Sequence, residues 1–530
     1  MNLDEYRAFD ATELARLVVE KEVTPVELLT LARRRAADVN PALNAIVIDI
    51  DEADAQAADP GLSGPFAGVP FLIKDLAQDY QGYPTSCGSR SLSKLPVAEH
   101  AHVTRRFLDA GLVIFGKTNT PEFGAKGITE PTLFGPARNP WNPGHTPGGS
   151  SGGSGAAVAA GIVPAAGAND GGGSIRIPSA CNGLVGLKPS RGLSPFGPAR
   201  GEQTFGMSVQ GVVARTVRDA AGLYDAIVGP TPSSVYPTPT PSTPFASQIA
   251  TPPSKLRIGF STESALAPSV HPEARAAVEH AAGILVDLGH IVEEVAPPYD
   301  DAALSRDFLT IWFAHLAAEV DSARRRTGAG DDDFEADTLA AAELGRSAGV
   351  VAAFNAFERV NHYVKSLSAF HDTYDYLLTP TLAKPPLQIG EIATPSLMRS
   401  ASRIMAKVHG GSIVTRTGVI DGLVEQNLGW VPYTQVANLT GRPAINVPLY
   451  WTGAGSEASG PNVTGAGSEA SGPSVTGAGS EASGPSVTGA GLPLGVQFVG
   501  GLGSDGGLLA LAAQLEQAAP WAHRYTGVAV

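Results

Sequence analysis

Two glycine clusters, each with serine inside it, decide the fold and chemistry expected of this chain: Gly148-Gly-Ser150-Ser151-Gly-Gly153 and Gly171-Gly-Gly-Ser174-Ile-Arg176-Ile-Pro178. Glycine lets the backbone turn sharply and bring its N–H groups close to a bound group. A serine among such N–H groups is where an acyl-transfer nucleophile and an oxyanion hole would lie. The two clusters therefore favour nucleophilic catalysis by serine.

A lysine lies in an apolar run upstream of both clusters, in Val69-Pro-Phe-Leu-Ile-Lys74-Asp75. Apolar flanks predict burial, and burial disfavours the ammonium form, so we expect a lowered pKa for Lys74. A neutral amine can accept a proton. Together with Ser150 and Ser174, Lys74 indicates hydrolysis of an amide-like bond by a Ser–Ser–Lys relay.

The simpler alternative is that both clusters are tight turns with incidental serines. Glycine-rich turns are common, so one cluster alone would carry little weight. Two clusters, a lysine in an apolar run and Arg176 shortly after Ser174 are harder to explain in this way. We therefore favour the catalytic interpretation.

Composition indicates an ordinary globular protein. The 530 residues are 43% hydrophobic and 17% charged, which allows two or three ordinary domains or one large α/β domain. The net charge of −14 disfavours a broad phosphate-binding surface, because such a surface needs clustered lysine and arginine. No apolar run approaches the roughly 18 residues of a membrane span. We expect neither nucleic acid nor a membrane as a partner.

The two cysteines, Cys87 and Cys181, do not form the pattern of a disulfide framework. We interpret them as small buried side chains. The first residues show neither the basic region nor the apolar stretch of a signal peptide. These features predict a reducing, cytoplasmic location.

Local patterns in the first part of the chain predict alternating helices and strands. Residues 1–45 indicate two helices, and Thr24-Pro-Val-Glu27 has the cap residue, proline and glutamate of a helix start. Over residues 68–190, short apolar runs alternate with glycine-rich turns and small-residue helices such as 156–160. This alternation predicts the α/β class.

The second part of the chain continues the alternation. Residues 229–254 are rich in proline and predict an extended surface connector. Residues 300–370 are helix-rich, with a break at 327–333. The remaining predicted elements are a helix at 271–289 and strands at 255–260, 290–295, 444–449 and 494–499.

Residues 453–488 repeat a 12-residue unit three times: Gly-Ala-Gly-Ser-Glu-Ala-Ser-Gly-Pro-(Asn/Ser)-Val-Thr. A solenoid repeat must bury one face against its neighbour, and this unit has almost no bulky apolar residue to bury. We predict a flexible low-complexity insertion between two strands.

Two short motifs match known patterns but lack the required context. Gly111-Leu-Val-Ile-Phe-Gly116-Lys117-Thr118 fits the phosphate-loop pattern, yet its four middle residues are apolar and predict a buried strand. Gly148-Gly-Ser150-Ser-Gly152 fits the nucleophile elbow of α/β-hydrolases, which needs a strand directly before the serine. Three prolines in residues 139–147 argue against that strand.

Histidine and metal chemistry find little support in the sequence. None of the eleven histidines lies in a recognisable triad context. His100-Ala-His102 could be a metal pair, but no cysteine or carboxylate completes it. We expect no metal and no organic cofactor.

Seven segments carry a resemblance to a known family: Gly68-Val-Pro-Phe-Leu-Ile-Lys74-Asp75, Gly116-Lys-Thr-Asn-Thr-Pro-Glu122-Phe, Arg138-Asn-Pro-Trp-Asn142, residues 148–189, Leu378-Thr-Pro-Thr381, Pro432-Tyr-Thr-Gln-Val-Ala-Asn-Leu-Thr-Gly-Arg-Pro443 and Leu492-Pro-Leu-Gly-Val-Gln-Phe-Val-Gly500. On these motifs the chain resembles the amidase signature family over nearly its whole length. Residues 300–430 match only loosely. The resemblance implies an α/β fold in which helices cover both faces of a central mixed, twisted β-sheet.

The resemblance also implies a single amidase domain over residues 1–530. Its expected parts are N-terminal helices (1–65), a signature core (66–228), the proline-rich connector (229–254), a helix-rich substrate region (300–430) and the repeat insertion (453–488).

Catalytic roles follow from the same resemblance. It implies that Ser174 is the nucleophile, that Lys74 is the base, and that Ser150 bridges them after a cis peptide bond from Gly149. The N–H groups of the second cluster would form the oxyanion hole, from Gly171, Gly172, Gly173 and Ser174.

Three residues are expected to support this loop without contacting substrate: Ser151, Asp170 and Arg176. Asp170 and Arg176 would pair with each other. One position departs from the family, which often has threonine or serine before the aspartate, whereas this chain has Asn169. The Asn-Asp pair resembles the branch with 6-aminohexanoate cyclic-dimer hydrolases and urethane-cleaving amidases.

The resemblance therefore predicts hydrolysis of C–N bonds in linear or cyclic non-peptide amides, with carbamates and esters as further candidates. The expected partner is a small amide or carbamate, and the expected assembly is a monomer or homodimer. A second interpretation is the amidase subunit of a tRNA-dependent amidotransferase, and a third is a catalytically inactive binding protein. We expect specificity to depend on residues near Trp312, Phe313 and Ile404.

Overall fold

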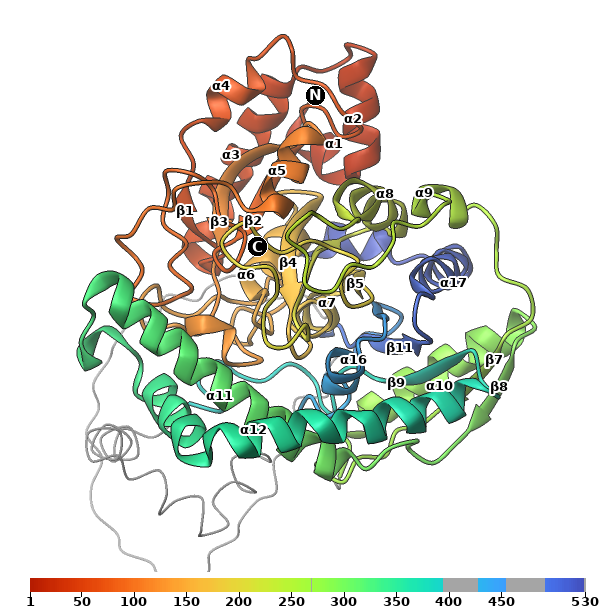
Figure 1. Ribbon diagram of the computed structural model, residues 1–530. Coiled ribbons are helices and arrows are strands. Elements are labelled where there is room, and N and C mark those ends of the chain that lie inside the picture. The colour runs from red at the N-terminus through yellow and green to blue at the C-terminus, as the bar shows by residue number, and fades with distance from the viewer. Residues whose placement is uncertain (268, 394–427, 454–490, 529–530) are drawn as a thin grey trace, which may run out of the picture.

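The computed structural model describes residues 1–267, 269–393, 428–453 and 491–528. Two mixed β-sheets lie side by side, the first near the centre and the second reaching one edge of the molecule, with helices packed around them (Figure 1). The predicted α/β class is confirmed. The strands are divided between two hydrogen-bonded sheets, which a bridge between Val185 and Ala214 connects.

The first sheet has the order β1-β3-β2-β4-β6. Its three central strands run parallel, and both outer strands are antiparallel to their neighbours. Parallel strands covered on both sides read as continuous apolar runs, and β2 is buried along its whole length. The strands are β1 (Ile46–Asp49), β2 (Pro70–Lys74), β3 (Val113–Thr118), β4 (Ala165–Asp170) and β6 (Val209–Ala214).

The second sheet has the order β5-β10-β11-β9-β7-β8. Its strands are β5 (Gly186–Lys188), β10 (Ala444–Val447), β11 (Val496–Gly500), β9 (Tyr376–Pro380), β7 (Arg257–Phe260) and β8 (Ile291–Glu294). All four strands predicted in the second part of the chain are therefore present, with slightly different ends.

The N-terminal segment contains three helices, so the prediction of two was wrong. They are α1 (Leu3–Ala8), α2 (Ala11–Val19) and α3 (Pro25–Leu43). The chain is extended at Phe9, and Asp10 then caps α2 by accepting a hydrogen bond from the N–H of Glu13. The capping box predicted at Thr24 and Glu27 is present at the start of α3.

Most remaining helices are short and pack against the sheets or against one another. They are α4 (Ala53–Ala57), α5 (His102–Asp109), α6 (Gly152–Ala159), α7 (Arg176–Asn182), α8 (Val217–Ile227), α9 (Phe245–Gln248), α10 (Pro272–Asp287), α16 (Gln435–Thr440) and α17 (Asp505–Ala518). Single 3₁₀ turns form η1 (Glu122–Gly124), η2 (Asp331–Asp333) and η3 (Ala522–Gly527).

Two long helices, α11 (Asp301–Thr327) and α12 (Ala336–His371), form a hairpin along one end of the molecule (Figure 1). Gly328 ends α11 in the left-handed conformation, which glycine adopts at low cost. The predicted break lies between the helices. A second break within α12 occurs at Gly349, where φ is 78°.

The rejected phosphate loop is strand β3, as its apolar residues predicted. Lys117 on this strand is fully buried, and its amine donates to Pro84 O and Thr85 Oγ1. The residues before Ser150 form turns and no strand among the described elements, which agrees with rejection of the nucleophile elbow.

The proline-rich connector at 229–254 is irregular apart from α9. Predicted repeats over 453–488 lie outside the described residues apart from Gly453. Just beside them, Trp451 and Pro493 pair in an isolated bridge, so the described residues on either side of this segment lie next to each other. No helix in the described ranges is long and apolar enough to cross a membrane.

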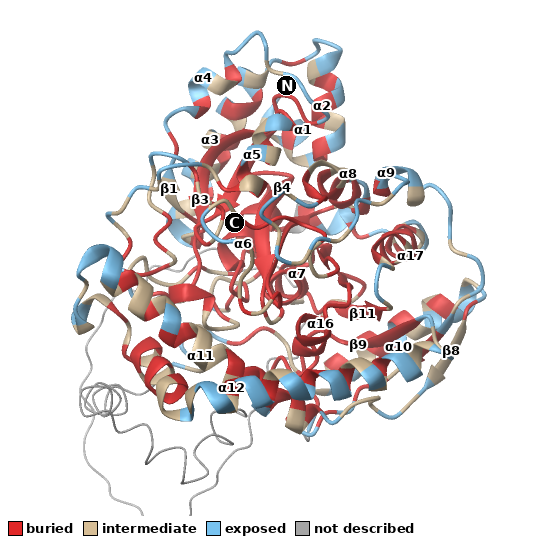
Figure 2. Cartoon of the chain, in the orientation of Figure 1, coloured by how far each residue is buried: buried red, intermediate tan, exposed pale blue. Residues whose placement is uncertain are grey.

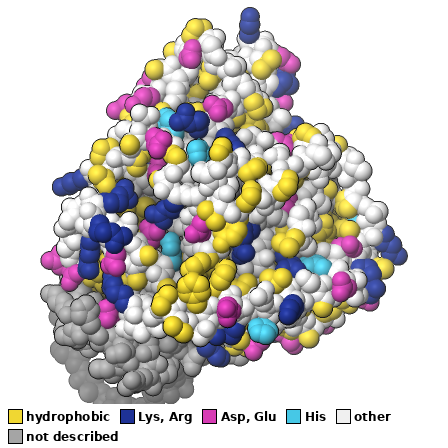
Figure 3. Space-filling view, in the orientation of Figure 1, with side chains coloured by type: hydrophobic (Ala, Val, Ile, Leu, Met, Phe, Trp, Pro, Cys, Tyr) yellow, Lys and Arg dark blue, Asp and Glu magenta, His cyan; other side chains and the backbone are white. Residues whose placement is uncertain are grey.

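Burial follows this architecture. Strands β2, β3, β4 and β6 of the first sheet and helices α6, α7 and α16 are buried almost throughout, whereas α11 and α12 alternate buried and exposed faces (Figure 2). On the face shown in Figure 3, lysine and arginine lie among aspartate and glutamate. The glycine clusters thus belong to the most buried part of the molecule.

Candidate active site

Lys74 and Ser150 meet in the interior. Lys74 is the last residue of β2 and is completely buried, and Ser150 is only 2% exposed. The distance from Lys74 Nζ to Ser150 Oγ is 2.7 Å, within hydrogen-bonding range. Two of the three residues predicted for the relay are therefore in direct contact.

Close packing around the first cluster explains its glycines. The Gly149–Ser150 peptide bond is cis, as the resemblance implied. A Cβ atom on Gly149 would lie 2.6 Å from Ile128 O, and one on Gly153 would lie 2.4 Å from Asn119 N. A side chain at either position would collide with this backbone. The turn that carries Ser150 can therefore pack against these neighbouring segments only if both positions are glycine.

Ser174 lies in the loop between β4 and α7 and is 8% exposed. Among the described residues, no hydrogen bond joins Ser174 to Ser150. Catalytic hydrogen bonds are often long before substrate binds and shorten in the complex. The structure thus places Lys74 in contact with Ser150, whereas no hydrogen bond joins Ser150 to Ser174 among the described residues.

The glycines before Ser174 present free donors. The N–H of Gly173 donates to Asp170 Oδ1 at 2.6 Å and is therefore occupied. The N–H groups of Gly171, Gly172 and Ser174 donate to no acceptor in the described part of the chain. Three of the four predicted oxyanion donors remain available, and Gly173 is not among them.

Asp170 and Arg176 hold this loop through a buried ion pair. Both are inaccessible to solvent, and the guanidinium makes two bonds to the carboxylate, at 2.9 and 3.0 Å. The N–H of Ile175 donates to the same carboxylate at 3.2 Å. The predicted pairing of Asp170 with Arg176 is confirmed.

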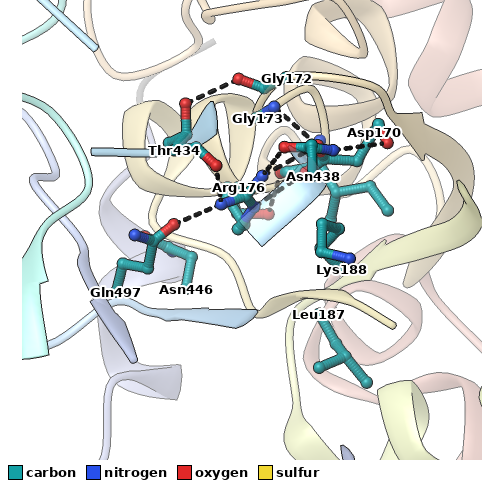
Figure 4. A network of polar contacts seen from close by, with 12 residues as sticks. Asp170, Gly172, Gly173, Arg176, Leu187, Lys188, Thr434, Asn438, Asn446 and Gln497 are labelled. Carbon is teal, nitrogen blue, oxygen red and sulfur yellow. Dashed lines mark hydrogen bonds and ion pairs between the residues drawn. The ribbon is translucent and has the colours of Figure 1, made fainter. Parts of the chain in front are cut away.

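Amide and hydroxyl side chains from distant segments complete the network around Arg176 (Figure 4). Its guanidinium also donates to Thr434 O, Gln497 Oε1 and Asn438 Oδ1. Thr434 Oγ1 in turn donates to Gly172 O at 2.7 Å. The loop is therefore held from α16 and β11 as well as from its own ion pair.

The Ser151 hydroxyl contacts the backbone of β4. It lies 3.3 Å from Asn169 O and 3.4 Å from Asn169 N. These contacts connect the first glycine cluster to the strand that leads into the second. The supporting role expected of Ser151 stays a prediction.

Burial favours the uncharged form of Lys74. Its removal from water lowers the pKa of the amine well below the ordinary lysine value, and the nearby Asp170 carboxylate only partly opposes this. For Asp170, burial raises the pKa, but Arg176 and hydrogen bonds outweigh it and hold the pKa below its usual range. The site therefore combines an amine whose uncharged form is favoured by burial with a carboxylate whose charged form is favoured by its pairing with Arg176.

Aromatic side chains of α11 pack against the loop that carries Ser174. A Cβ on Gly171 would lie 3.1 Å from Trp312, and one on Gly172 would lie 2.6 Å from Phe308. The two rings stack at 5.5 Å between centroids. Trp312, predicted to be near the specificity region, thus borders the nucleophile loop, whereas Ile404 lies outside the described residues.

Several residues at this site had no predicted role: Asn169 as a partner of Lys74, and Thr434, Asn438 and Gln497 as partners of the nucleophile loop. All four lie in segments already quoted as motifs. Polar amides inside apolar runs could have signalled buried hydrogen bonding. The residues with which they form hydrogen bonds could not be predicted, because these residues lie far away in the sequence.

Known proteins are similar in sequence to this chain over almost its whole length. The family model described as Amidase matches residues 27–509. The chain is 34% identical over 527 residues to a 6-aminohexanoate-cyclic-dimer hydrolase of Pseudomonas sp. (strain NK87), covering 97% of this chain and 96% of that protein. It is 35% identical over 518 residues to a putative amidase, AmiC, of Mycobacterium tuberculosis, covering 97% and 95%.

Solved structures give the same picture. A 6-aminohexanoate cyclic dimer hydrolase superposes with a TM-score of 0.82 at 31% identity, and 98% of each chain is covered. A glutamyl-tRNA(Gln) amidotransferase subunit from Thermotoga maritima reaches 0.72 at 26% identity, covering 97% of this chain and 96% of that one.

Proposed function

This chain belongs to the amidase family and is a hydrolase of carbon–nitrogen bonds in small non-peptide amides, and on that premise we propose that it works through an acyl-enzyme on Ser174. The observation that carries the proposal is the buried contact between Lys74 and Ser150. A buried, neutral amine within 2.7 Å of a hydroxyl is a base ready to accept its proton.

The first half of the reaction transfers two protons and forms one bond. Lys74 takes a proton from Ser150 as Ser150 takes one from Ser174. The Ser174 oxygen attacks the substrate carbonyl, whose oxygen becomes negative. N–H groups of Gly171, Gly172 and Ser174 are the donors free to bind it, and such a donor contributes roughly 3 kcal/mol to the transition state.

The second half releases the amine and then the acid. Lys74 returns the proton through Ser150 to the leaving nitrogen, because an unprotonated amide ion is too poor a leaving group. Water then attacks the acyl-enzyme by the same relay and frees Ser174. Every proton that leaves a nucleophile is used again on a leaving group.

The proposed substrates are linear or cyclic non-peptide amides, with carbamates and esters as further candidates. Each presents a carbonyl to the same donors. The relatives named as 6-aminohexanoate-cyclic-dimer hydrolases support cyclic amides. Stacked Phe308 and Trp312 beside the loop favour an apolar group next to the reacting carbonyl.

A hydrolysis panel tests the proposal. Purified enzyme is offered aliphatic amides, anilides, nylon oligomers and carbamates, and released amine is measured. We expect turnover of at least one amide class that is lost in Ser174→Ala. Hydrolysis that persists in this variant would contradict the acyl-enzyme mechanism.

The amidotransferase alternative has less support. The Thermotoga protein superposes less closely than the cyclic dimer hydrolase, with TM-scores of 0.72 and 0.82. Copurification decides between the two, because a component of an amidotransferase would be isolated with partner chains and tRNA. An active enzyme purified alone would exclude dependence on such partners.

A further inference from the structure

Lys74 has a second polar neighbour besides Ser150. Its Nζ lies 2.7 Å from Asn169 Oδ1, the same distance as to Ser150 Oγ. Asn169 is on β4, next to Asp170, and is only 6% exposed. The base of the proposed relay therefore stands between one hydroxyl and one amide oxygen.

Neighbouring groups fix the orientation of the Asn169 amide. Its Nδ2 donates to Leu76 O at 2.6 Å. If the amide were turned over, Asn169 Oδ1 would lie about where Nδ2 is now, close to Leu76 O, and two acceptors would face each other. The amide N–H group would then point at the amine of Lys74. The backbone of Asn169 is itself in contact with the Ser151 hydroxyl. The side chain can therefore offer Lys74 only a hydrogen-bond acceptor.

A neutral amine carries two N–H bonds and one lone pair. With one N–H bonded to Asn169, rotation about the terminal bond of Lys74 is restricted, and the lone pair can be directed at Ser150. An amine with no such partner could rotate an N–H toward Ser150 and present no acceptor to it.

We propose that Asn169 is a positioning residue that holds Lys74 so that its lone pair faces Ser150. The inference rests on the proposed function, in which Lys74 is the base. Asn169 touches neither substrate nor the reacting serines in this role. It acts only through the amine.

The chemistry of an amide suits the role. It does not ionise, it accepts from the amine, and it accepts more strongly from the ammonium formed during proton transfer. A carboxylate here would hold Lys74 in the charged form. The ionisable groups that act on Lys74 are Asp170 and Cys87. Asn169 contacts the amine without adding a charge, because an amide does not ionise.

Asn169→Asp is the first test, because it adds a charge at almost constant shape. We expect the rise of kcat/KM with pH to shift upward by at least about one unit, since a carboxylate beside the amine raises its pKa. Activity at neutral pH should fall about tenfold or more and recover in alkaline solution. The midpoint is read from the active fraction, so partial unfolding does not move it.

A matched pair, Asn169→Thr and Asn169→Val, is the second test. The two side chains have nearly the same shape, and only threonine keeps an acceptor. We expect kcat of the valine variant to be at least about tenfold lower than that of the threonine variant, with similar KM, because misdirected proton transfer slows chemistry and not binding. Melting temperatures of the pair are compared to exclude a difference in folding.

The assay uses the nitroanilide of butyric acid, with Ser174→Ala as reference. An unshifted midpoint in Asn169→Asp, or equal kcat in the matched pair, overturns the role of Asn169 while Ser174→Ala stays inactive. Activity in Ser174→Ala instead overturns the proposed function, and the role of Asn169 falls with it.

Discussion

The amine of Lys74 and the hydroxyl of Ser150 lie 2.7 Å apart although 76 residues separate them in the chain. Lys74 ends β2, a buried central strand of the first mixed sheet, and Ser150 lies in the turn before α6. Neither group is accessible enough to exchange its partner for water. This contact is the basis of the predictions for Lys74 and Ser150 below.

Replacing the nucleophile should abolish turnover. Ser174→Ala removes one oxygen in a loop held by Asp170 and Arg176, so we expect the fold to persist. The hydrolysis rate and the circular dichroism spectrum are measured together. More than a few per cent of the wild-type rate in a folded variant would show that Ser174 is not the nucleophile.

The activity of the enzyme should rise with pH. Burial lowers the pKa of Lys74, so the neutral, proton-accepting form increases as pH rises through that pKa, which lies below the ordinary value of about 10.4. The profile of kcat/KM should therefore rise and then reach a plateau. A profile that is flat, or that falls over this range, contradicts a lysine base.

Lys74→Arg should be nearly inactive, because a guanidinium stays protonated at any usable pH. The matched control is Lys384→Arg at a partly exposed ion pair with Glu391, which should behave as wild type. Rates of both variants are compared at the plateau. An active Lys74→Arg enzyme would exclude the base role.

Ser150→Ala should reduce amide hydrolysis more than ester hydrolysis. The relay carries a proton to the leaving group, and an activated ester needs that proton less than an amine does. General acid–base steps contribute roughly 10² to 10⁴ in rate. The nitroanilide and the nitrophenyl ester of one acid give the comparison. Equal losses on both would indicate that Ser150 only supports the loop.

Breaking the buried ion pair should destabilise the protein. Arg176→Met leaves the Asp170 carboxylate buried without its partner, which costs about 3–5 kcal/mol in comparable cases. Urea unfolding measures the loss. The control is Arg257→Met, which breaks an exposed pair with Glu293 and should leave the midpoint almost unchanged. Equal effects in the two variants would refute this view of the network.

Deleting residues 453–488 should leave activity and melting temperature nearly unchanged. The bridge between Trp451 and Pro493 already brings the flanking segments together, and residue 452 with residues 489–492 would remain to join them. Loop closure changes by only about 0.6 kcal/mol per doubling of length. A loss of several kcal/mol would mean that the repeats pack on the body.

Local sequence patterns predicted much of the fold because they report local physics. Spacing and apolar runs predicted the capping box at Thr24 and the buried strand at residues 113–118. They also predicted strands β7, β8, β10 and β11 of the second sheet. The number of N-terminal helices was wrong, since the chain breaks at Phe9 and Asp10 and starts a new helix only two residues after α1 ends. The division into two sheets was not predictable, because pairing of strands depends on contacts across the chain.

The candidate site divides in the same way. Lys74, Ser150 and Ser174 were identified from apolar flanks, glycine clusters and the family resemblance, all of which are present in the linear sequence. The occupied N–H of Gly173 and the amide partner of Lys74 were not. Hydrogen bonds between segments depend on distances of tenths of an ångström, which residue order does not encode locally.

The sequence by itself thus determined which groups are available for chemistry: an amine in an apolar run and two serines among glycines. Only the tertiary structure decided which of them meet and in what charge state. Burial of Lys74 at the end of β2 lowers its pKa, and Asp170 paired with Arg176 shapes the loop that carries Ser174. Both effects require packed neighbours that exclude water, and those neighbours come from strands and helices far apart in the chain.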